Sequence, residues 1–363
     1  MELIELHILQ SFPVTCLNRD DVGAPKSAVF GGCQRARVSS QCWKRAIRTL
    51  AKSYDPGSFA GERSRFLVKA LEDKFVGKGR PSEEANILAL TVAEAMGKLD
   101  DPEKGNVKTL LYFSPLEFDS VADKMLEQSF DELMPVLLQH DGDEKKEAQK
   151  KLNKLAKKAA KHLGDAVKDT ADIAIFGRMV ADDHTLTVEG AGLFSHALTT
   201  HAAVNEIDFF SAVDDRNILD RGSGHMGTLE FNAGCYYRYV GLSVDLLGDD
   251  QHLGHFSGNE RMAVIRTFLK SAILAVPTAR KNSMFGDNPP EYILGFRRKG
   301  QPLSLINAFE SPVRNGDGFL SESKNRLKAH WDKVKDMYCL GKDIIHTGEM
   351  PPENLDAFIG GLV

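Results

Sequence analysis

The first residues of the chain alternate between apolar and polar side chains. Ile4, Leu6 and Ile8 fall on one face of an extended segment that ends near Pro13, because successive side chains of a strand point to opposite faces. A second alternation, over residues 235–244, predicts another strand. Shorter strands are predicted at 171–176, 229–231 and 292–296.

Apolar residues recur at helical spacing in the middle of the chain. Intervals of three and four residues over 65–74, 82–98, 119–138 and 144–161 predict amphipathic helices. Two more helices are predicted at 260–274 and 323–338. The order of these elements predicts an α+β fold in which residues 57–164 form an inserted helical subdomain. Residues 180–228 are too long for a plain hairpin turn, and such a segment is normally functional or disordered.

A further helix is predicted to begin at Ser39 or Ser40, either of which can act as its N-cap. At about 100° per residue, its polar side chains gather within an arc of roughly 100°: Gln41, Lys44, Arg45, Arg48 and Lys52. The opposite side carries apolar residues that can anchor the helix: Trp43, Ala46, Ile47 and Leu50.

The charge balance makes this basic face informative. The chain has 46 basic and 51 acidic residues and a formal net charge of -5, so any attraction for a polyanion must be local. Residues 22–54 contain no acidic side chain, but they include Lys26, Arg35, Arg37, Lys44, Arg45, Arg48 and Lys52. The helix N-terminus also favours an anion, and Gly31-Gly32 can let the backbone approach a ligand closely. A solvated helix face on an ordinary domain is the alternative.

The last helix of the predicted insertion is rich in lysine. Residues 144–161 contain two acidic residues, Glu144 and Glu147, against Lys145, Lys146, Lys150, Lys151, Lys154, Lys157, Lys158 and Lys161. Such a helix can be merely solvated, or it can form a second electrostatic track for nucleic acid.

Signals for other classes of protein are missing. The five cysteines form no C-x-x-C pair, which argues against a disulfide framework and a structural zinc site. There is no apolar run that could span a bilayer and no signal peptide at the start, so we expect a soluble, cytoplasmic protein without a membrane partner.

The sequence lacks several common motifs of enzymes. It has no phosphate loop of the G-x-x-x-x-G-K-[ST] type, no H-E-x-x-H and no G-x-S-x-G. Asp20-Asp21 and Asp182-Asp183-His184 lack the spacing of a known metal site. We expect Asp20 and Asp21 to cap a turn or orient Arg19, and we predict no cofactor and no metal.

An ordered series of motifs carries a resemblance to a known family. The opening blocks are Cys16-Leu17-Asn18-Arg19-Asp20-Asp21, Phe30-Gly31-Gly32 and Arg37-Val38-Ser39-Ser40-Gln41 with Lys44-Arg45-Ala46. Later blocks are Gly177-Arg178-Met179, Thr199-Thr200-His201, Gly224-His225-Met226-Gly227-Thr228, Tyr237-Arg238-Tyr239 and Asn307-Ala308-Phe309-Glu310. In this order they resemble the CasC (Cse-type) backbone subunit of type I-E CRISPR Cascade, within the repeat-associated mysterious protein superfamily.

The resemblance implies a hand-like structure. An RNA-recognition-motif-like (ferredoxin-like) palm would consist of residues 1–56 and 165–363, with an extended thumb at about 180–234 and helical fingers at 57–164. Several copies, beside other Cascade subunits, would line up along one CRISPR guide RNA and present it for pairing with target DNA, without catalysis of their own.

The resemblance also implies roles for individual residues. Guide contacts are expected from Arg19, Lys26, Arg37, Ser40, Gln41, Lys44, Arg45, Arg48 and Arg178, with Met179 as an apolar wedge against a base and Ser211 nearby. Target DNA is expected along Lys145, Lys146, Lys150, Lys151, Lys154 and Lys158.

Two other functions remain open at this point. One is a guide-directed ribonuclease in which Asp20 promotes cleavage of the backbone. The other is a general RNA-binding protein that acts alone.

Overall fold

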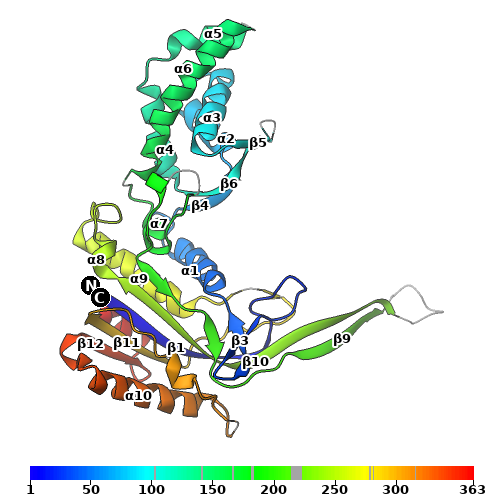
Figure 1. The fold of residues 1–363 in the computed structure, drawn as a ribbon, viewed down its shortest axis with the longest axis vertical. Coiled ribbons are helices and arrows are strands. Elements are labelled where there is room, and N and C mark those ends of the chain that lie inside the picture. The colour runs from blue at the N-terminus through cyan, green and yellow to red at the C-terminus, as the bar shows by residue number, and fades with distance from the viewer. Residues whose placement is uncertain are drawn as a thin grey trace. The chain divides into compact units, whose positions relative to one another are not determined.

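The computed structural model describes residues 1–101, 104–139, 142–165, 167–180, 184–213, 223–277, 279–280, 282–314 and 316–363 (Figure 1). The chain divides into two compact units. Unit 1 contains Met1–Tyr54, Gly192–Asp245 and Met262–Val363, and unit 2 contains Asp55–Ala191 and Leu246–Arg261. The inserted unit therefore reaches beyond the predicted boundary at residue 164 and also takes in a second stretch of chain.

Unit 1 is built on an antiparallel sheet with β1 (Glu2–Thr15) near its centre. β1 pairs with β10 (Ser223–Ser243) on one side and with β11 (Tyr292–Lys299) on the other, so that Leu6 lies opposite both Val240 and Gly295. The sheet continues in the order β12-β11-β1-β10-β8-β3-β2. The outer strands are β12 (Ile344–Met350), β8 (Ala197–Thr199), β3 (Cys33–Val38) and β2 (Ser27–Phe30), and β7 (Gly192–Phe194) also pairs with β10.

Helices cover both faces of this sheet. On one face, Tyr237, Tyr239 and Phe296 pack with Leu327 and Trp331 of α10 (Leu320–Met337). The other face meets α1 (Ser40–Tyr54) and α9 (Gly258–Leu274). The alternating segment 235–244 is thus confirmed as a strand up to Ser243, the end of β10, but residues 235–243 are buried on both faces.

On the second face of the sheet, the side chain of Arg238 contacts both α1 and α9. The buried guanidinium of Arg238 lies 4.2 Å from the ring centroid of Trp43 in α1. It also donates to the carbonyl oxygens of Ala272 (2.6 Å) and Ile273 (3.0 Å) in α9. The basic helix α1 is therefore held on the sheet through its apolar side, as its sequence predicts.

The long segment 180–228, for which the sequence predicted no element, contains β7, β8, β9 and the start of β10. β9 (Glu206–Val213) pairs with the first half of β10 as an antiparallel two-stranded ribbon. β10 is one continuous strand where the sequence predicts two shorter ones.

Unit 2 combines helices with a small sheet. Its helices are α2 (Val68–Gly77), α3 (Ser82–Met96), α4 (Pro115–Leu126), α5 (Met134–Gln139), α6 (Asp143–Ala160) and α7 (Ala171–Phe176). Helices α2 to α6 share a continuous apolar core. The strands β4 (Glu62–Phe66), β5 (Leu99–Asp101) and β6 (Asn106–Phe113) form an antiparallel sheet in the order β4-β6-β5. Two short helices complete the chain, α8 (Val244–Leu247) and α11 (Leu355–Leu362).

Several expectations for this region are wrong. The predicted strand at 171–176 is the helix α7, in which every residue is buried, and a short, wholly apolar run does not distinguish a strand from a buried helix. The predicted helix at 119–138 is split between α4 and α5, and the insertion contains strands as well as helices. Among the described residues, no helix is long and apolar enough to cross a membrane.

The buried His7 of β1 makes unit 1 sensitive to acid. Its Nδ1 lies 2.9 Å from the hydroxyl of Tyr237, and burial lowers its pKa to about 3 from 6.5. The folded state therefore holds the neutral ring. The stability that this provides is complete above pH 6.5 and is lost as the pH falls toward 3, by up to about 1.4 kcal/mol per pH unit.

We predict that His7→Gln makes the stability of unit 1 less dependent on pH between 6.5 and 3 than that of the wild type. Tryptophan fluorescence during urea unfolding reports on this unit, because both tryptophans, Trp43 and Trp331, lie in it. The buried His201, whose pKa burial also lowers, leaves a residual slope. His184→Gln, at an exposed position of unit 2, is the control. An unchanged slope in His7→Gln would contradict the assignment.

Candidate nucleic-acid interface

The start of α1 is positioned by serine and asparagine side chains. The hydroxyl of Ser39 accepts from the amide of Cys42 (3.3 Å), which confirms a serine N-cap for this helix. The amide of Ser39 donates to the side chain of Asn18 (2.9 Å), and that of Ser40 lies 3.0 Å from the Nδ1 atom of His196. These bonds join the preceding loop and the helix into one local structure.

Asp20 shapes the loop before the helix. Its Oδ1 accepts from the amides of Val22 (3.0 Å) and Ala24 (2.9 Å), which is the turn-capping role predicted from the sequence. The neighbouring side chain of Arg19 is exposed. The loop therefore presents a cation from a backbone that the adjacent carboxylate holds in place.

The β2–β3 hairpin corrects one expectation about its glycines. Gly31 and Gly32 occupy its two-residue turn with φ of 59° and 73°, as a type I′ turn requires. A Cβ at Gly31 would lie 1.6 Å from the carbonyl oxygen of Glu310. At Gly31 the close approach is therefore to the protein's own backbone, whereas the space beside Gly32 is open.

Arg35, one of the cations of the acid-free segment, is also structural. Its guanidinium is buried and donates to the carbonyl oxygens of Thr199 (3.1 Å) and Phe309 (2.8 Å).

Most of the other candidate side chains lie around the first two turns of α1. Lys26 and Arg37 lie close enough to His196 to lower its pKa, after the larger effect of its partial burial. Lys44 lies over the ring of Phe194, with its Nζ 5.0 Å from the centroid. Gln41 and Arg45 are exposed, and Ser40 and Arg48 are half-buried.

On one side of α1, three arginines line a groove of about 820 Å³, which we call the cationic groove: Arg19, Arg45 and Arg280. Arg280 was not predicted. It belongs to the loop between α9 and β11, and its backbone has a φ of 54°, an uncommon value for a residue with a side chain that marks a position for functional scrutiny. Its Nε is buried without a hydrogen-bond partner among the described residues. No periodicity in the sequence could have revealed it.

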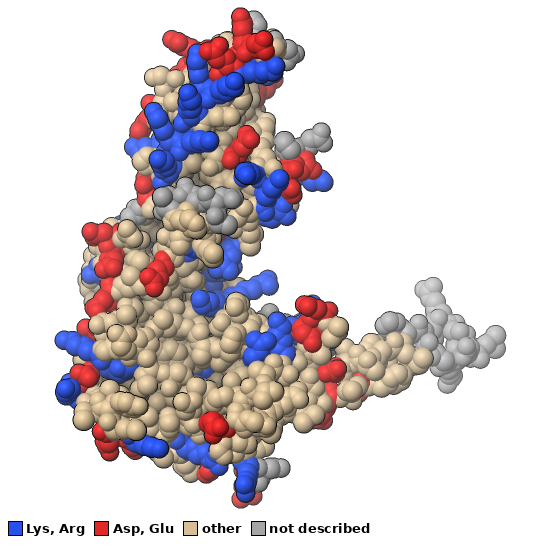
Figure 2. Space-filling view, viewed as in Figure 1, with Lys and Arg blue, Asp and Glu red and all other residues tan. Residues whose placement is uncertain are grey.

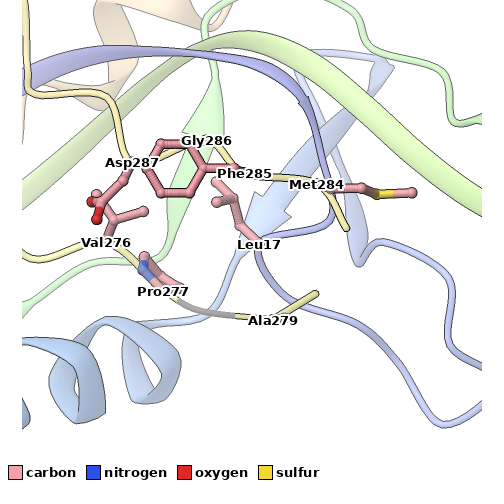
Figure 3. A pocket seen from close by; sticks show the side chains of 8 residues that line it. All are labelled: Leu17, Val276, Pro277, Ala279, Met284, Phe285, Gly286 and Asp287. Carbon is pink, nitrogen blue, oxygen red and sulfur yellow. The ribbon is translucent and has the colours of Figure 1, made fainter. Parts of the chain in front are cut away.

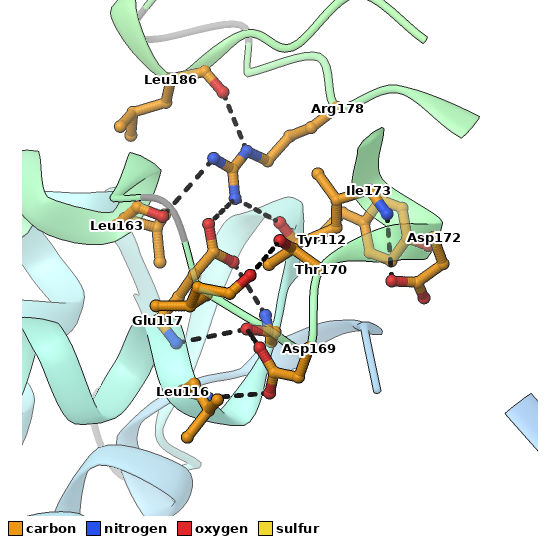
Figure 4. Close-up of polar contacts among 12 residues, drawn as sticks. Tyr112, Leu116, Glu117, Leu163, Asp169, Thr170, Asp172, Ile173, Arg178 and Leu186 are labelled. Carbon is orange, nitrogen blue, oxygen red and sulfur yellow. Dashed lines mark hydrogen bonds and ion pairs between the residues drawn. The ribbon is translucent and has the colours of Figure 1, made fainter. Parts of the chain in front are cut away.

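Arg178 does not support its predicted role as a phosphate contact. Its side chain, in unit 2, is 2% exposed and donates to the Glu117 carboxylate at 2.6 Å, to the carbonyl of Leu186 (2.8 Å) and to that of Tyr112 (3.3 Å) (Figure 4). Burial raises the pKa of Glu117 to about 7, against the opposing pull of Arg178. The guanidinium is thus an internal clasp between α4, β6 and the chain around Leu186.

The adjacent Met179 is 82% exposed, so it does not fill the core. Ser211 is exposed on β9. Met179 lies in unit 2 and Ser211 in unit 1.

The lysines of α6 form a row on the surface of unit 2. Figure 2 shows basic side chains along this helix, whose opposite face, with Leu152 and Ala156, is in the core. Lys146 pairs with Asp143 (3.2 Å) and Lys151 with Glu147 (3.7 Å), both as exposed pairs. Lys145 is half-buried, and the exposed residues Lys150, Lys154, Lys157, Lys158 and Lys161 continue the row.

The acidic candidates fall only in part within the described residues. Asp182 and Asp183 lie outside the described residues. Within the part of the chain that the structure describes, no three His, Cys, Asp or Glu side chains are placed to hold a metal ion.

A family model described as CT1975-like protein matches residues 4–354. The chain belongs to this CT1975-like family. No curated protein matches it.

Two solved chains are similar to this CT1975-like protein. One, from a "CRISPR RNA-guided surveillance complex, pre-nicking", has 24% identity and a TM-score of 0.80 over 99% of this chain and 100% of its own. The other, from a "CRISPR RNA-guided surveillance complex", has 22% identity and a TM-score of 0.59 over 98% of this chain and 92% of its own. At these identities the likeness shows a shared α+β fold with antiparallel sheets.

We predict that Arg178→Leu destabilises unit 2 of this CT1975-like protein by about 3–5 kcal/mol, because it leaves Glu117 buried without its partner. The double variant Arg178→Leu with Glu117→Gln should recover part of the loss. Hydrogen exchange of the α4 and β6 amides measures the effect. Full protection in Arg178→Leu would show that the clasp is not needed.

Proposed function

We propose that this CT1975-like protein is a non-catalytic subunit of the crRNA-guided Cascade surveillance complex, of type I-E, in which it binds the CRISPR guide RNA. The observation that carries the proposal is the gathering of Arg19, Lys26, Arg37 and Arg45 around the N-terminus of α1 in a protein of net charge -5. Guanidinium and ammonium groups at a helix N-terminus suit the phosphates of a nucleic-acid backbone. The family match and the similar chains from CRISPR RNA-guided surveillance complexes support it.

The ribbon of β9 and β10 supports a role for several copies along one guide. Ile207, Phe209 and Met226 are 71%, 63% and 61% exposed. Phe209 lies two residues along β9 from Ile207, and Met226 lies opposite Ser211, so the three share one face of the ribbon. Exposed apolar residues on an extended ribbon suit contact with a neighbouring copy or with an unstacked base. We propose this ribbon as the thumb, unit 2 as the fingers and the β11-β1-β10 sheet as the RNA-recognition-type palm.

The lysine row of α6 is proposed to hold target DNA. Its cations lie on a different unit from the proposed guide site. A row of lysines contacts phosphates without reading sequence, so sequence recognition would belong to base pairing between the guide and the target.

The non-catalytic assignment rests on Asp20, whose carboxylate holds the turn of its own loop. The carboxylate on which a ribonuclease mechanism would depend accepts two backbone amides in its own loop. These hydrogen bonds favour a role for Asp20 in holding the turn over a role in cleaving RNA.

We predict that Lys44→Glu with Arg48→Glu abolishes copurification of guide RNA, because two cations of the helix face become repulsive to phosphate. Sequencing and quantification of the bound RNA measure this. Lys333→Glu with Lys342→Glu changes the charge equally at exposed positions outside α1 and should leave the RNA content intact. Unchanged RNA content in the α1 variant would refute the guide site.

We predict that replacing Lys150, Lys151, Lys154 and Lys158 by Gln weakens capture of target DNA while guide RNA is retained. The slope of log K against log salt concentration is negative, and its magnitude should decrease by about 0.7–0.9 for each phosphate that the protein no longer neutralises. Binding of target DNA at several salt concentrations gives this slope. The control replaces four other surface lysines of unit 2: the exposed Lys69, Lys104 and Lys108, and Lys124, whose side chain is 39% exposed. Equal loss of guide and target would contradict the division between the two units.

A further inference from the structure

We propose that Phe285, beside the cationic groove, is a stacking platform for one unstacked base of the RNA whose phosphates the groove binds. The inference rests on the proposed function, because it presupposes that unit 1 binds RNA. It adds a base contact to a site otherwise defined by phosphate contacts, on a loop that the sequence motifs did not single out.

The ring of Phe285 is exposed and next to cations. It is 66% exposed and shares a small niche with Leu17 and Met284 (Figure 3). Val276, Pro277 and Ala279 line both this niche and the cationic groove, so the two adjoin. The niche holds only about 20 Å³, enough for about one water molecule. A base would therefore stack on the exposed ring rather than enter the niche.

The loop that carries Phe285 is fixed on the sheet. A Cβ at Gly286 would lie 2.2 Å from the Cγ2 atom of Thr15, so this glycine permits the backbone to lie directly against the end of β1. The side chain of Gln10 donates to the carbonyl of Asn288 at 2.6 Å. The amide of Met284 donates to the carbonyl of Arg280 at 2.9 Å. These contacts hold the described residues around Phe285 against β1 and link Met284 to Arg280, which lowers the entropy cost of binding.

The chemistry of the groove favours single-stranded nucleic acid as the occupant. Single-stranded nucleic-acid sites combine cations that follow the backbone with aromatic rings on which bases stack. Arg19, Arg45 and Arg280 provide the first element, and Phe285 provides the second. Asp287 is the one acidic side chain among the described residues that line the groove. Beside the ring, a carboxylate can accept a hydrogen bond from a base amino group or a ribose 2′-hydroxyl.

The test is ultraviolet crosslinking of the purified, RNA-containing complex, with the crosslinked peptides identified by mass spectrometry and the yield normalised to bound RNA. We expect an RNA adduct on the peptide that contains Phe285. Phe285→Ala should lower this yield at least about fivefold, and Phe285→Tyr should retain it. Phe285→Leu, which keeps an apolar side chain without a π face, should lose the adduct like Phe285→Ala. Phe66→Ala removes a similarly exposed phenylalanine from unit 2 and should have no effect.

The failure of this inference differs from failure of the proposed function. An unchanged yield in Phe285→Ala and Phe285→Leu, or RNA adducts only on other peptides, would overturn the stacking role while guide binding stands. Chemical crosslinking of the 284–287 peptide to another protein chain in place of RNA would also overturn it. A wild-type complex without bound RNA would overturn the proposed function, and this inference with it.

Discussion

The proposed guide site depends on the pairing of β1 with β10 and β11. These strands come from the start, the middle and the end of the chain, and their registers fix Leu9 opposite Tyr237 and Tyr292. Burial on both faces defines the register strongly, because a slip of one residue would exchange the two sets of side chains. One face carries His7 and Glu5, and the other carries Arg238. A shifted register would therefore move Arg238 away from Trp43 and detach α1, whose basic face depends on that anchor.

Buried polar groups give this packing its specificity. Arg298 is ion-paired with Glu5, and the hydroxyl of Tyr239 donates to the same carboxylate at 2.6 Å. Arg238 finds its partners in the last turn of α9. Each of these groups would be costly to bury alone, because the interior offers no water to replace a missing partner. Three segments distant in sequence are thereby required to assemble in one arrangement, which also places the α9–β11 loop beside α1.

Local sequence patterns predicted those helices and strands whose secondary structure follows from their own residues alone. The alternation of Ile4, Leu6 and Ile8 identified β1, and the opposed faces of 40–52 identified α1 and its serine cap. The sequence did not reveal the roles of Arg35 and Arg178. Arg178 depends on Glu117, 61 residues away, and Arg35 depends on carbonyls 164 and 274 residues away. In sequence these two arginines do not differ from cations that bind phosphate, so only tertiary contacts separate the buried cations from the surface cations.

The cations that stay on the surface decide where this protein can attract a polyanion. Within the acid-free segment, the buried Arg35 stabilises the fold, whereas Arg45 lines the groove. Arg19, which precedes the segment, also lines the groove. An acidic protein gains no general attraction for nucleic acid from its net charge, so the local field of the groove must provide it. Arg280 strengthens that field from a distant part of the chain, at a backbone angle that an arginine rarely adopts. An unfavourable conformation persists only where surrounding structure enforces it, and Phe285 lies close to Arg280 along the same loop. The groove therefore combines charge with a nearby ring, which a solvated helix face would not require.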